Sequence, residues 1–545
     1  MKSLSKFYFI SFFLIKVSMF LLLLLVMKSC YYSNMLIEFE VYALNSIHFF
    51  YIIYIDLYSI LFCLLVLIIS SMILIYSKNY IMKDCLRFLW LMILFIFFMI
   101  IMIFSPSIMG VILGWDGLGM ISYSLVIYYQ SKDSWNSGFV TAATNRLGDT
   151  MLLISIFISL ISNSMFLLWE MVNLFSIMFL ILACMTKSAQ FPFSAWLPAA
   201  MAAPTPISSL VHSSTLVTAG VYLLIRFHYI LYNSSILIII LLSSLITIIV
   251  AGCSALYEMD LKKVVALSTL GQLGFMVMIL SMGSILVSFF HLLVHAMFKA
   301  LLFMCVGCII HLGINIQDMR KMGDLNISMM IQISMKISSF SLLGIPFSSG
   351  FYSKDLLLEL ILCSNGGLGL GMLVMMSVLL TIMYSMRNFF YLSKTNYWLI
   401  WKEPDSKIYI PVFILSILNI YMGSVLNWLI MMDLNFIILT KVMKFMPICL
   451  IIMGSILQFF TFNKMKNFLL TSMMFMSSMT KFMSFFLINM LYWTKNVDQG
   501  WFEMVMFLNK KVILNNIKWF NFKVFNMKNM FIMVINVSII YLILF

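Results

Sequence analysis

The sequence predicts an all-α membrane protein that crosses the bilayer many times. Of its 545 residues, 63% are hydrophobic and only 10% are charged, a composition that excludes a soluble globular domain. Charge-free runs such as residues 88–115, 150–169 and 227–257 are each long enough to span a bilayer. At ~20 residues for each span, we expect roughly fifteen transmembrane helices.

The rest of the composition narrows the class of protein further. The 51 methionines and 50 phenylalanines indicate an AT-rich, organelle-encoded gene. The net charge of +14 does not indicate nucleic-acid binding, because no soluble basic surface exists to carry it. We expect lysines at the membrane edges instead, near anionic headgroups of phospholipids such as cardiolipin. The nine cysteines are scattered singly, which argues against a disulfide framework.

One segment, residues 170–226, is the strongest candidate for a functional site. Between its terminal charges it carries a single formal charge, Lys187. A lysine at the bilayer centre costs about 3 to 10 kcal/mol. Prolines follow it closely, and Pro204 and Pro206 in particular predict a broken helix. A lysine that snorkels from a helix end is the alternative, but the break favours a functional lysine.

Three further charges precede this segment. Asp116 has spanning-length apolar sequence on both sides, which favours an intramembrane acid over a helix cap. Arg146 and Asp149 are three residues apart, so they share a helix face and can pair, either for function or only for structure. Within the segment itself, His212 is either a relay or a packing residue.

A second window, residues 264–317, again carries one formal charge, Lys299. Together with His291 and His295 it recurs every four residues, which places the three groups ~6 Å apart along one helical stripe. Titratable groups sharing a face in hydrocarbon indicate that charge is conducted or coupled. A zinc site is the weaker interpretation, because no third ligand is evident.

After this window the chain breaks again, and no cofactor motif follows. Lys354 and Asp355 lie just past Pro346, in a second predicted break. The sequence CVGCIIH at residues 305–311 indicates buried thiols rather than a metal site, because no second cysteine pair is present. The chain has no P-loop, dinucleotide fingerprint or iron–sulfur ligand set, so the chemistry we expect is movement of charge.

The ends of the chain differ from its centre. We expect a retained first helix at the N-terminus rather than a signal peptide, followed by a partly polar loop over residues 28–56. Residues 463–528 carry nine lysines and two acids among apolar residues, which is typical of an amphipathic helix along the membrane surface. The expected divisions are N-terminal helices (1–104), two repeats (105–260 and 261–430), an additional helix (431–462), the lateral helix (463–528) and an anchor (529–545).

Five motifs occur in an order that resembles one family. They are GWDGLGMISYSLVIYYQ, NRLGD, KSAQFPFSAWLPAAMAAPTPISSLVHSSTLVTAGVYL, HLLVHAMFKALLFM and FSSGFYSKD. Together they resemble the chain 5 family of mitochondrial NADH–ubiquinone oxidoreductase, respiratory complex I, which is homologous to the large subunits of multi-subunit cation/proton antiporters. The resemblance is strong over residues 115–355.

The resemblance implies a fold and a set of roles. The fold has inverted repeats with discontinuous helices and a lateral helix that contacts neighbouring antiporter-like subunits in the mitochondrial inner membrane. The chain would translocate protons, while FMN, iron–sulfur clusters and ubiquinone lie on other subunits. The implied proton path runs through the family's acid, the first-channel lysine, a relay histidine, the central stripe and an exit pair: Asp116, Lys187, His212, His291, His295, Lys299, Lys354 and Asp355.

Two departures and two alternatives accompany the resemblance. Many relatives have Glu in place of Asp116, whose side chain is one methylene shorter, and the N-terminal part is short. An Mrp-type cation/proton antiporter subunit would exchange Na⁺ without NADH. A purely structural subunit would tolerate lysine substitutions and lose assembly when truncated before Asn463.

Overall fold

The structure is a computed structural model that divides into two compact units, residues 1–476 and 477–545. The described part of the chain comprises residues 2–31, 34–44, 47–81, 84–161, 174–229, 236–313, 315–322, 329–363, 367–393, 406–431, 439–461, 473, 488, 492–497 and 500. All of the helices and strands named below belong to the first unit. The predicted lateral helix and the C-terminal anchor lie almost entirely outside the described residues.

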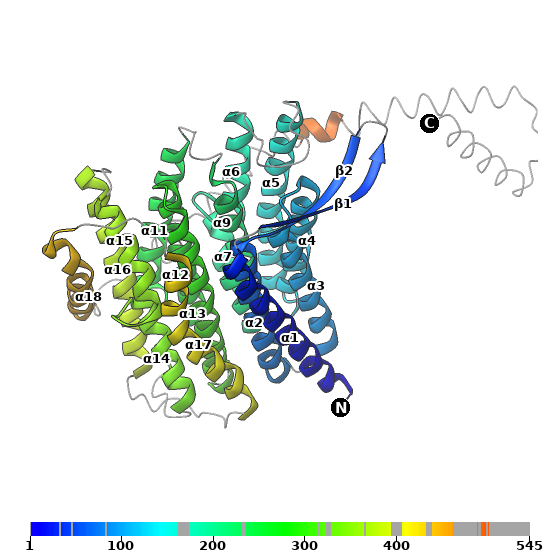
Figure 1. Cartoon of the computed structure of the whole chain (residues 1–545). Helices are drawn as coiled ribbons and strands as arrows, with labels where there is room; N and C mark the ends of the chain where they lie inside the picture. Colours follow the sequence, from blue (N-terminus) through cyan, green and yellow to red (C-terminus); the bar gives the residue numbers. More distant parts are fainter. Residues whose placement is uncertain are drawn as a thin grey trace, which may run out of the picture. The chain divides into compact units, whose positions relative to one another are not determined.

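The N-terminal part combines two helices with a β-hairpin. Helix α1 (Lys2–Tyr31) packs along α2 (Leu57–Tyr80) (Figure 1). In the sequence between these helices, strands β1 (Met35–Leu44) and β2 (Ile47–Ile55) form an antiparallel hairpin. The expected loop over residues 28–56 is therefore wrong. Residues 47–55 are rich in β-branched and aromatic side chains, which favour strands, and residues 36–41 alternate apolar and acidic positions in part.

The next three helices are connected by short turns. Helix α3 (Cys85–Phe104) ends before the turn Ser105–Ser107, as expected, and α4 (Ile108–Val126) begins directly after it. Helix α5 (Lys132–Ile161) packs against α4, and its first turn takes up most of the expected loop at residues 131–135. These helices place Trp115, Asp116 and Asp149 on neighbouring elements.

The predicted broken helix is confirmed. Helix α6 (Leu174–Lys187) ends at the lysine, and short turns follow in place of a continuous helix. A π-helical stretch then leads into the last helix of the segment. In order, the elements after α6 are η2 (Phe193–Ala195), α7 (Trp196–Ala199), η3 (Ala200–Ala202), α8 (Thr205–Ile207), η4 (Ser208–Thr215) and α9 (Leu216–Arg226).

Three long helices form the centre of the unit. Helix α11 (Leu237–Tyr257) is joined to α12 (Leu261–Ser281) by a short polar turn, and the two helices pack together. Helix α13 (Ile285–Leu312) follows. All but three of its 28 residues are buried, which is the expected pattern for a helix surrounded by protein rather than lipid.

The remaining helices contain the second break. Helix α14 (Met329–Leu343) stops just before Pro346, and α15 (Ser349–Cys363) starts just after it, as the sequence predicts. The later helices are α16 (Gly367–Ser393), α17 (Ser406–Ile430) and α18 (Lys441–Thr461). Ten helices in the described residues are long and apolar enough to cross a membrane. The prediction of a helical multi-spanning protein is confirmed, with the hairpin as an exception.

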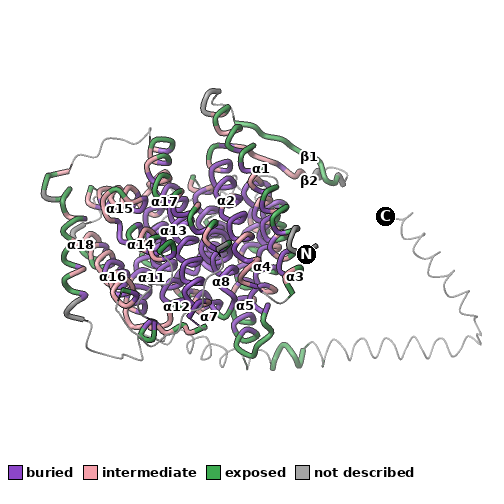
Figure 2. Tube along the Cα trace, turned by 90° about the horizontal axis from the view of Figure 1, so that it is seen from below, coloured by how far each residue is buried: buried purple, intermediate pink, exposed green. Residues whose placement is uncertain are grey.

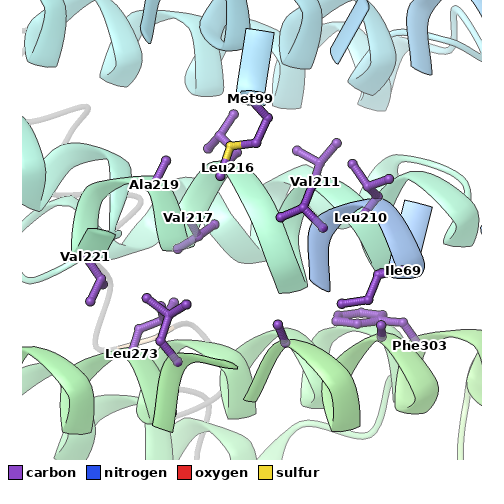
Figure 3. Close-up of a cluster of buried hydrophobic side chains, with 14 of the residues drawn as sticks. Ile69, Met99, Leu210, Val211, Leu216, Val217, Ala219, Val221, Leu273 and Phe303 are labelled. Atoms are coloured by element: carbon purple, nitrogen blue, oxygen red, sulfur yellow. The ribbon is translucent and has the colours of Figure 1, made fainter. Parts of the chain in front are cut away.

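Burial is concentrated around the first broken helix. Buried residues lie mainly on α2, α12 and α13 and on the broken segment, whereas α18 and strand β1 are largely exposed (Figure 2). Figure 3 shows η4 and α9 enclosed by α2, α3, α12 and α13. The apolar side chains drawn there include Ile69, Met99, Leu273 and Phe303 from these four helices. The irregular backbone is thus covered by protein, where broken helices are tolerated in membranes.

Candidate functional site

Lys187 is the last residue of α6 and lies at the centre of the first candidate site. Its side chain is only 1% exposed. The residues after it form turns, 3₁₀ segments and the four-residue helix α7 and contain Pro192 and Pro198, so α6 cannot continue. The lysine therefore projects from a helix end that is buried inside the protein.

The contacts of Lys187 come from α4. Its Nζ donates a hydrogen bond of 3.2 Å to the backbone oxygen of Trp115 and lies 4.8 Å from the centre of that indole ring. Gly119, one helical turn further on, leaves room for the ammonium, because a Cβ there would lie 3.3 Å from Nζ. Cation–π contact with tryptophan stabilises a desolvated ammonium.

Asp149 is the acid that Trp115 connects to this lysine. The indole N–H of Trp115 donates to Oδ1 of Asp149 over 2.8 Å. Arg146, predicted to pair with Asp149, does so at 3.1 Å, with the arginine side chain 55% exposed and the carboxylate 10% exposed. One carboxylate thus receives a buried indole on one oxygen and a surface guanidinium on the other.

Asp116 takes a different position from the one that a direct pair would require. Its side chain is half-buried on α4. Among the ion pairs of the described residues, none joins Asp116 to Lys187. The structure therefore places Lys187 against Trp115, and Asp116 one residue further along the same helix.

His212 lies on η4, the π-helical stretch, and is fully enclosed. It is 1% exposed, and neither ring nitrogen has a hydrogen-bond partner among the described residues. Its ring centre is 6.1 Å from that of Trp196. Hydroxyls of the same stretch satisfy backbone oxygens, as when Thr215 donates to Leu210 over 2.8 Å. Single π-helical turns are rare and often found at functional sites.

The central stripe has the predicted geometry. His291, His295 and Lys299 lie on α13 with 0% exposure, and the two imidazole centres are 6.4 Å apart. The hydrogen-bond partners of His291 and Lys299 are neutral. Oε1 of Gln272 lies 3.1 Å from Nε2 of His291, and the hydroxyl of Ser268 accepts a hydrogen bond from Nζ of Lys299.

The stripe is connected to the second break through a serine. The hydroxyl of Ser353 on α15 lies 2.9 Å from Nδ1 of His291. The next residue, Lys354, donates to the backbone oxygen of Leu342 at the end of α14. Asp355 is half-buried and forms no ion pair with Lys354 among the described residues. Helices α13, α14 and α15 thus meet at these polar contacts.

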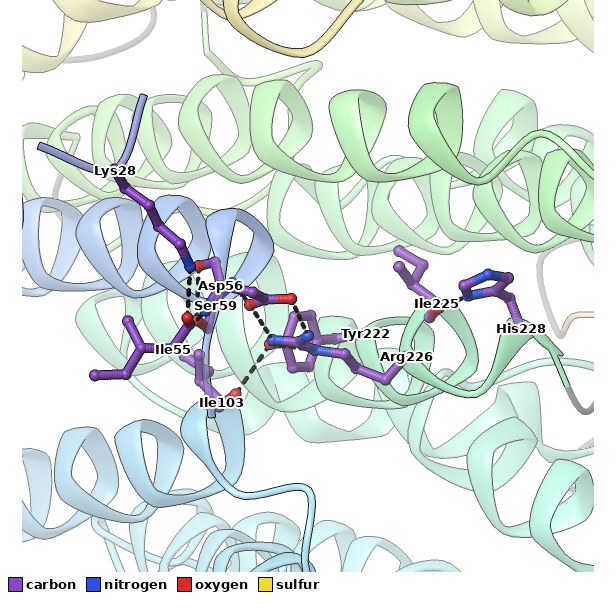
Figure 4. Close-up of polar contacts among 9 residues, drawn as sticks. All are labelled: Lys28, Ile55, Asp56, Ser59, Ile103, Tyr222, Ile225, Arg226 and His228. Carbon is purple, nitrogen blue, oxygen red and sulfur yellow. Dashed lines mark hydrogen bonds and ion pairs between the residues drawn. The ribbon is translucent and has the colours of Figure 1, made fainter. Parts of the chain in front are cut away.

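A separate, partly buried ion pair lies at the far end of the first broken segment. Arg226 at the end of α9 donates two hydrogen bonds to Asp56, the N-cap of α2, and also contacts the hydroxyl of Tyr222 (Figure 4). Tyr222 in turn donates to the backbone oxygen of Ile103. Asp56 also accepts from the backbone N–H of Ser59, which completes a capping box. This cluster ties α2, α3 and α9 together.

Several of these contacts could not be read from charge patterns. Trp115, Ser268, Gln272 and Ser353 are neutral, and Asp56 lay in the expected loop. The signal available for two of them is their spacing, because Ser268 and Gln272 are four residues apart in an otherwise apolar run. Within the described residues, no group of three or more histidine, cysteine or acidic side chains is arranged to hold a metal ion.

Comparison with known proteins gives the class of protein first. Residues 105–383 match the family model described as NADH:quinone oxidoreductase/Mrp antiporter, TM. A chain in the structure of the Mrp complex from Dietzia sp. has a TM-score of 0.74 at 20% identity, covering 94% of this chain and 63% of that one. A chain of the membrane-bound sulfane sulfur reductase, an archaeal respiratory membrane complex, has a TM-score of 0.67 at 19% identity, covering 82% and 93%. The fold is that of the antiporter-like membrane subunits.

Closer relatives identify the family. NADH-ubiquinone oxidoreductase chain 5 of Aedes aegypti is 42% identical over 522 residues, which cover 90% of this chain and 89% of the relative. The protein of the same name from Anopheles gambiae is 41% identical, covering the same shares. That from Anopheles arabiensis is 49% identical over 362 residues, covering 64% of this chain and 93% of the relative. The chain belongs to the NADH-ubiquinone oxidoreductase chain 5 family.

Proposed function

We propose that this chain is a core membrane-arm subunit of respiratory complex I, which translocates protons across the mitochondrial inner membrane during NADH:ubiquinone electron transfer. One observation carries the proposal. A chain 42% identical to an NADH-ubiquinone oxidoreductase chain 5 holds buried lysines and histidines in and beside two broken helices. Ionisable groups at such positions are costly in hydrocarbon and mark proton or ion paths.

In the first part of the path, Lys187 is the group that binds and releases the proton. Pairing with the half-buried Asp116 stabilises the charged lysine, and separation of the two favours release of its proton. His212, whose ring nitrogens have no hydrogen-bond partner among the described residues, receives the proton through intervening water. Asp149, held by Arg146, supplies a fixed negative charge near the lysine.

In the second part, the proton moves along α13 and leaves through the second break. Along this path Lys299 stores a charge against the Ser268 hydroxyl, and His295 and His291 pass the proton toward the exit. Lys354 and Asp355, directly after the break, form the exit pair. The Ser353 hydroxyl, which touches His291 and precedes Lys354, provides the contact between stripe and exit.

The same proposal includes the surroundings of the chain. Residues 105–260 and 261–430 form the two repeats, and residues 463–528 form a lateral helix that contacts neighbouring antiporter-like subunits. Lysines at the membrane edges bind phospholipids such as cardiolipin. The electron carriers, FMN and iron–sulfur clusters, and the ubiquinone site belong to other subunits.

The first experiment tests whether the chain migrates on a native gel together with a complex that has NADH dehydrogenase activity. Organelle membranes are solubilised, separated on a native gel, probed for this chain and stained for NADH dehydrogenase activity. We expect the chain to migrate with the activity. Migration in a smaller assembly without that activity would contradict the proposal, and Na⁺-dependent proton exchange by that assembly would favour an Mrp-type antiporter subunit.

The second experiment tests the lysine. Lys187→Met preserves length and apolar volume but removes the charge, so we expect normal assembly and loss of proton translocation. The matched control is Lys407→Met at an exposed position near the start of α17, which we expect to have no effect. An unchanged number of protons per electron in the Lys187 variant would overturn the assigned role and leave the structural interpretation.

A further inference from the structure

We propose that Trp115 is a positioning residue that couples Asp149 to Lys187 while keeping the two from forming a direct ion pair. This inference rests on the proposed proton-transfer role of Lys187. It concerns a neutral side chain that carries no charge of its own and cannot titrate. The coupling runs through three contacts made by that one residue.

The contacts involve three different parts of the tryptophan. Its backbone oxygen accepts from Lys187 over 3.2 Å, and its ring centre lies 4.8 Å from the same ammonium. Its indole N–H donates to Asp149 over 2.8 Å. A hydrogen bond to a charged acceptor is stronger than one between neutral groups. Trp115 therefore contacts the lysine with its face and backbone, and the acid with its edge.

The arrangement is rigid because the three helices pack closely. Trp115 is 1% exposed. Gly148, next to Asp149, allows α5 to approach α6 so closely that a Cβ there would lie 2.1 Å from Oγ1 of Thr186, the neighbour of Lys187. The indole has one polar hydrogen and no acceptor, so its nitrogen can only donate a hydrogen bond and never accept one. The lysine is thus held against the face of this buried ring and the acid at its edge.

This separation suits a lysine that must release its proton. In a low-dielectric interior the attraction between opposite charges is strong at contact and falls as they move apart. A direct ion pair between Lys187 and Asp149 would hold the proton on the lysine. Because the acid contacts the indole N–H instead of the ammonium, it favours the charged lysine less strongly than a direct ion pair would. Arg146 occupies the other carboxylate oxygen and restricts rotation of the acid toward the lysine.

The test is a double-mutant cycle in the assembled complex. Trp115→Phe keeps an aromatic ring and the backbone oxygen but removes the N–H, and Asp149→Asn removes the charge. We expect each to lower NADH-driven proton translocation about tenfold, the size expected for loss of a charge-assisted hydrogen bond. The double variant should be no worse than the stronger single variant, within about twofold. Multiplied effects would overturn the inference.

The matched control is Trp90→Phe, at a position 62% exposed on α3. It makes the same chemical change away from both charges, and we expect no effect on translocation. Failure of the inference is distinguishable from failure of the proposed function. If Lys187→Met abolishes translocation while the effects of the Trp115 and Asp149 substitutions multiply, the proposed function is supported and the coupling through Trp115 is refuted.

A spectroscopic measurement covers the case in which Trp115→Phe does not assemble. Ultraviolet resonance Raman difference spectra report the hydrogen bonding of indole N–H groups. We expect the Asp149→Asn variant to shift one indole band toward weaker hydrogen bonding, and Lys187→Met to shift the same band. A band that is unaffected by either substitution would overturn the proposed coupling.

Discussion

The first site and the central stripe support buried lysines in different ways. Lys187 lies against an aromatic face and a backbone oxygen, and the N–H of the same indole donates to a carboxylate. Lys299 donates to the hydroxyl of Ser268. The first arrangement supplies a nearby negative charge, whereas the contact described for the second is neutral.

Because of these different contacts, the two lysines of one chain are expected to bind protons with different strengths. A buried ammonium is destabilised by loss of water, and a nearby carboxylate compensates more of that cost than a hydroxyl does. The charged form is therefore favoured more at Lys187 than at Lys299. In the proposed path, such a gradient would let a proton be accepted at Lys187 and held only briefly at Lys299.

The largest effect is expected when an acidic side chain is added to the neutral central stripe. Gln272→Glu places a carboxylate beside Nε2 of His291, where an amide oxygen now lies 3.1 Å away. We expect the protonated ring to be stabilised by about 2 kcal/mol, which traps the proton and slows translocation roughly thirtyfold. The measurement is proton translocation per NADH oxidised.

The control for that substitution is Gln332→Glu, which adds the same charge at a half-buried position on α14. We expect its effect to be small by comparison. Equal loss in the two variants would mean that any added charge disturbs this region and that the neutrality of the stripe has no special role.

A milder change removes the neutral partner of the second lysine. Ser268→Ala deletes the hydroxyl that accepts from Lys299, and loss of a hydrogen bond to a charged group costs about 1.5 kcal/mol, or roughly tenfold in translocation rate. Ser254→Ala on α11 is the control, because this buried serine, like Ser268, donates to a backbone oxygen three residues earlier. The interpretation fails if both serine variants translocate at the same rate.

The smallest effect is expected from a change beside the ammonium of Lys187 in the first site. A Cβ at Gly119 would lie 3.3 Å from Nζ of Lys187, so Gly119→Ala displaces the ammonium by a few tenths of an ångström and should slow translocation about two- to threefold. At Gly271 on α12, a new Cβ would have the Cβ of Ala251 as its nearest neighbour, 3.9 Å away. Gly271→Ala should leave translocation unchanged and stabilise the helix by up to about 1 kcal/mol. Equal rates in the two alanine variants would remove the steric argument.

Charge and proline patterns predicted the elements of the site well. A lone lysine followed by prolines indicated the end of α6 and the broken segment, and Pro346 indicated the second break. The four-residue spacing placed His291, His295 and Lys299 on one helix. These features are visible in a sequence because each has a large local cost in hydrocarbon, and that cost limits where such residues occur.

The partners of those residues could not be predicted in the same way. Trp115 and Lys187 are 72 positions apart, and the contact depends on how α4 packs against the end of α6. Asp116 looked like the natural partner because it carries a charge, yet the neighbouring neutral residue makes the contact. The hairpin was not predicted because acidic residues stand among the strand-forming side chains between Met35 and Ile55, which made this stretch resemble a polar loop.

The ion pair between Arg226 and Asp56 also has a consequence for the order of synthesis. The two residues are 170 positions apart in the chain. At typical rates of roughly 5 to 20 residues per second, the ribosome needs about ten to thirty seconds to make that length. During this interval α2 can form with its capping box complete, but the carboxylate of Asp56 has no arginine. The contact between α2 and α9 therefore forms only after the whole first broken segment has left the ribosome.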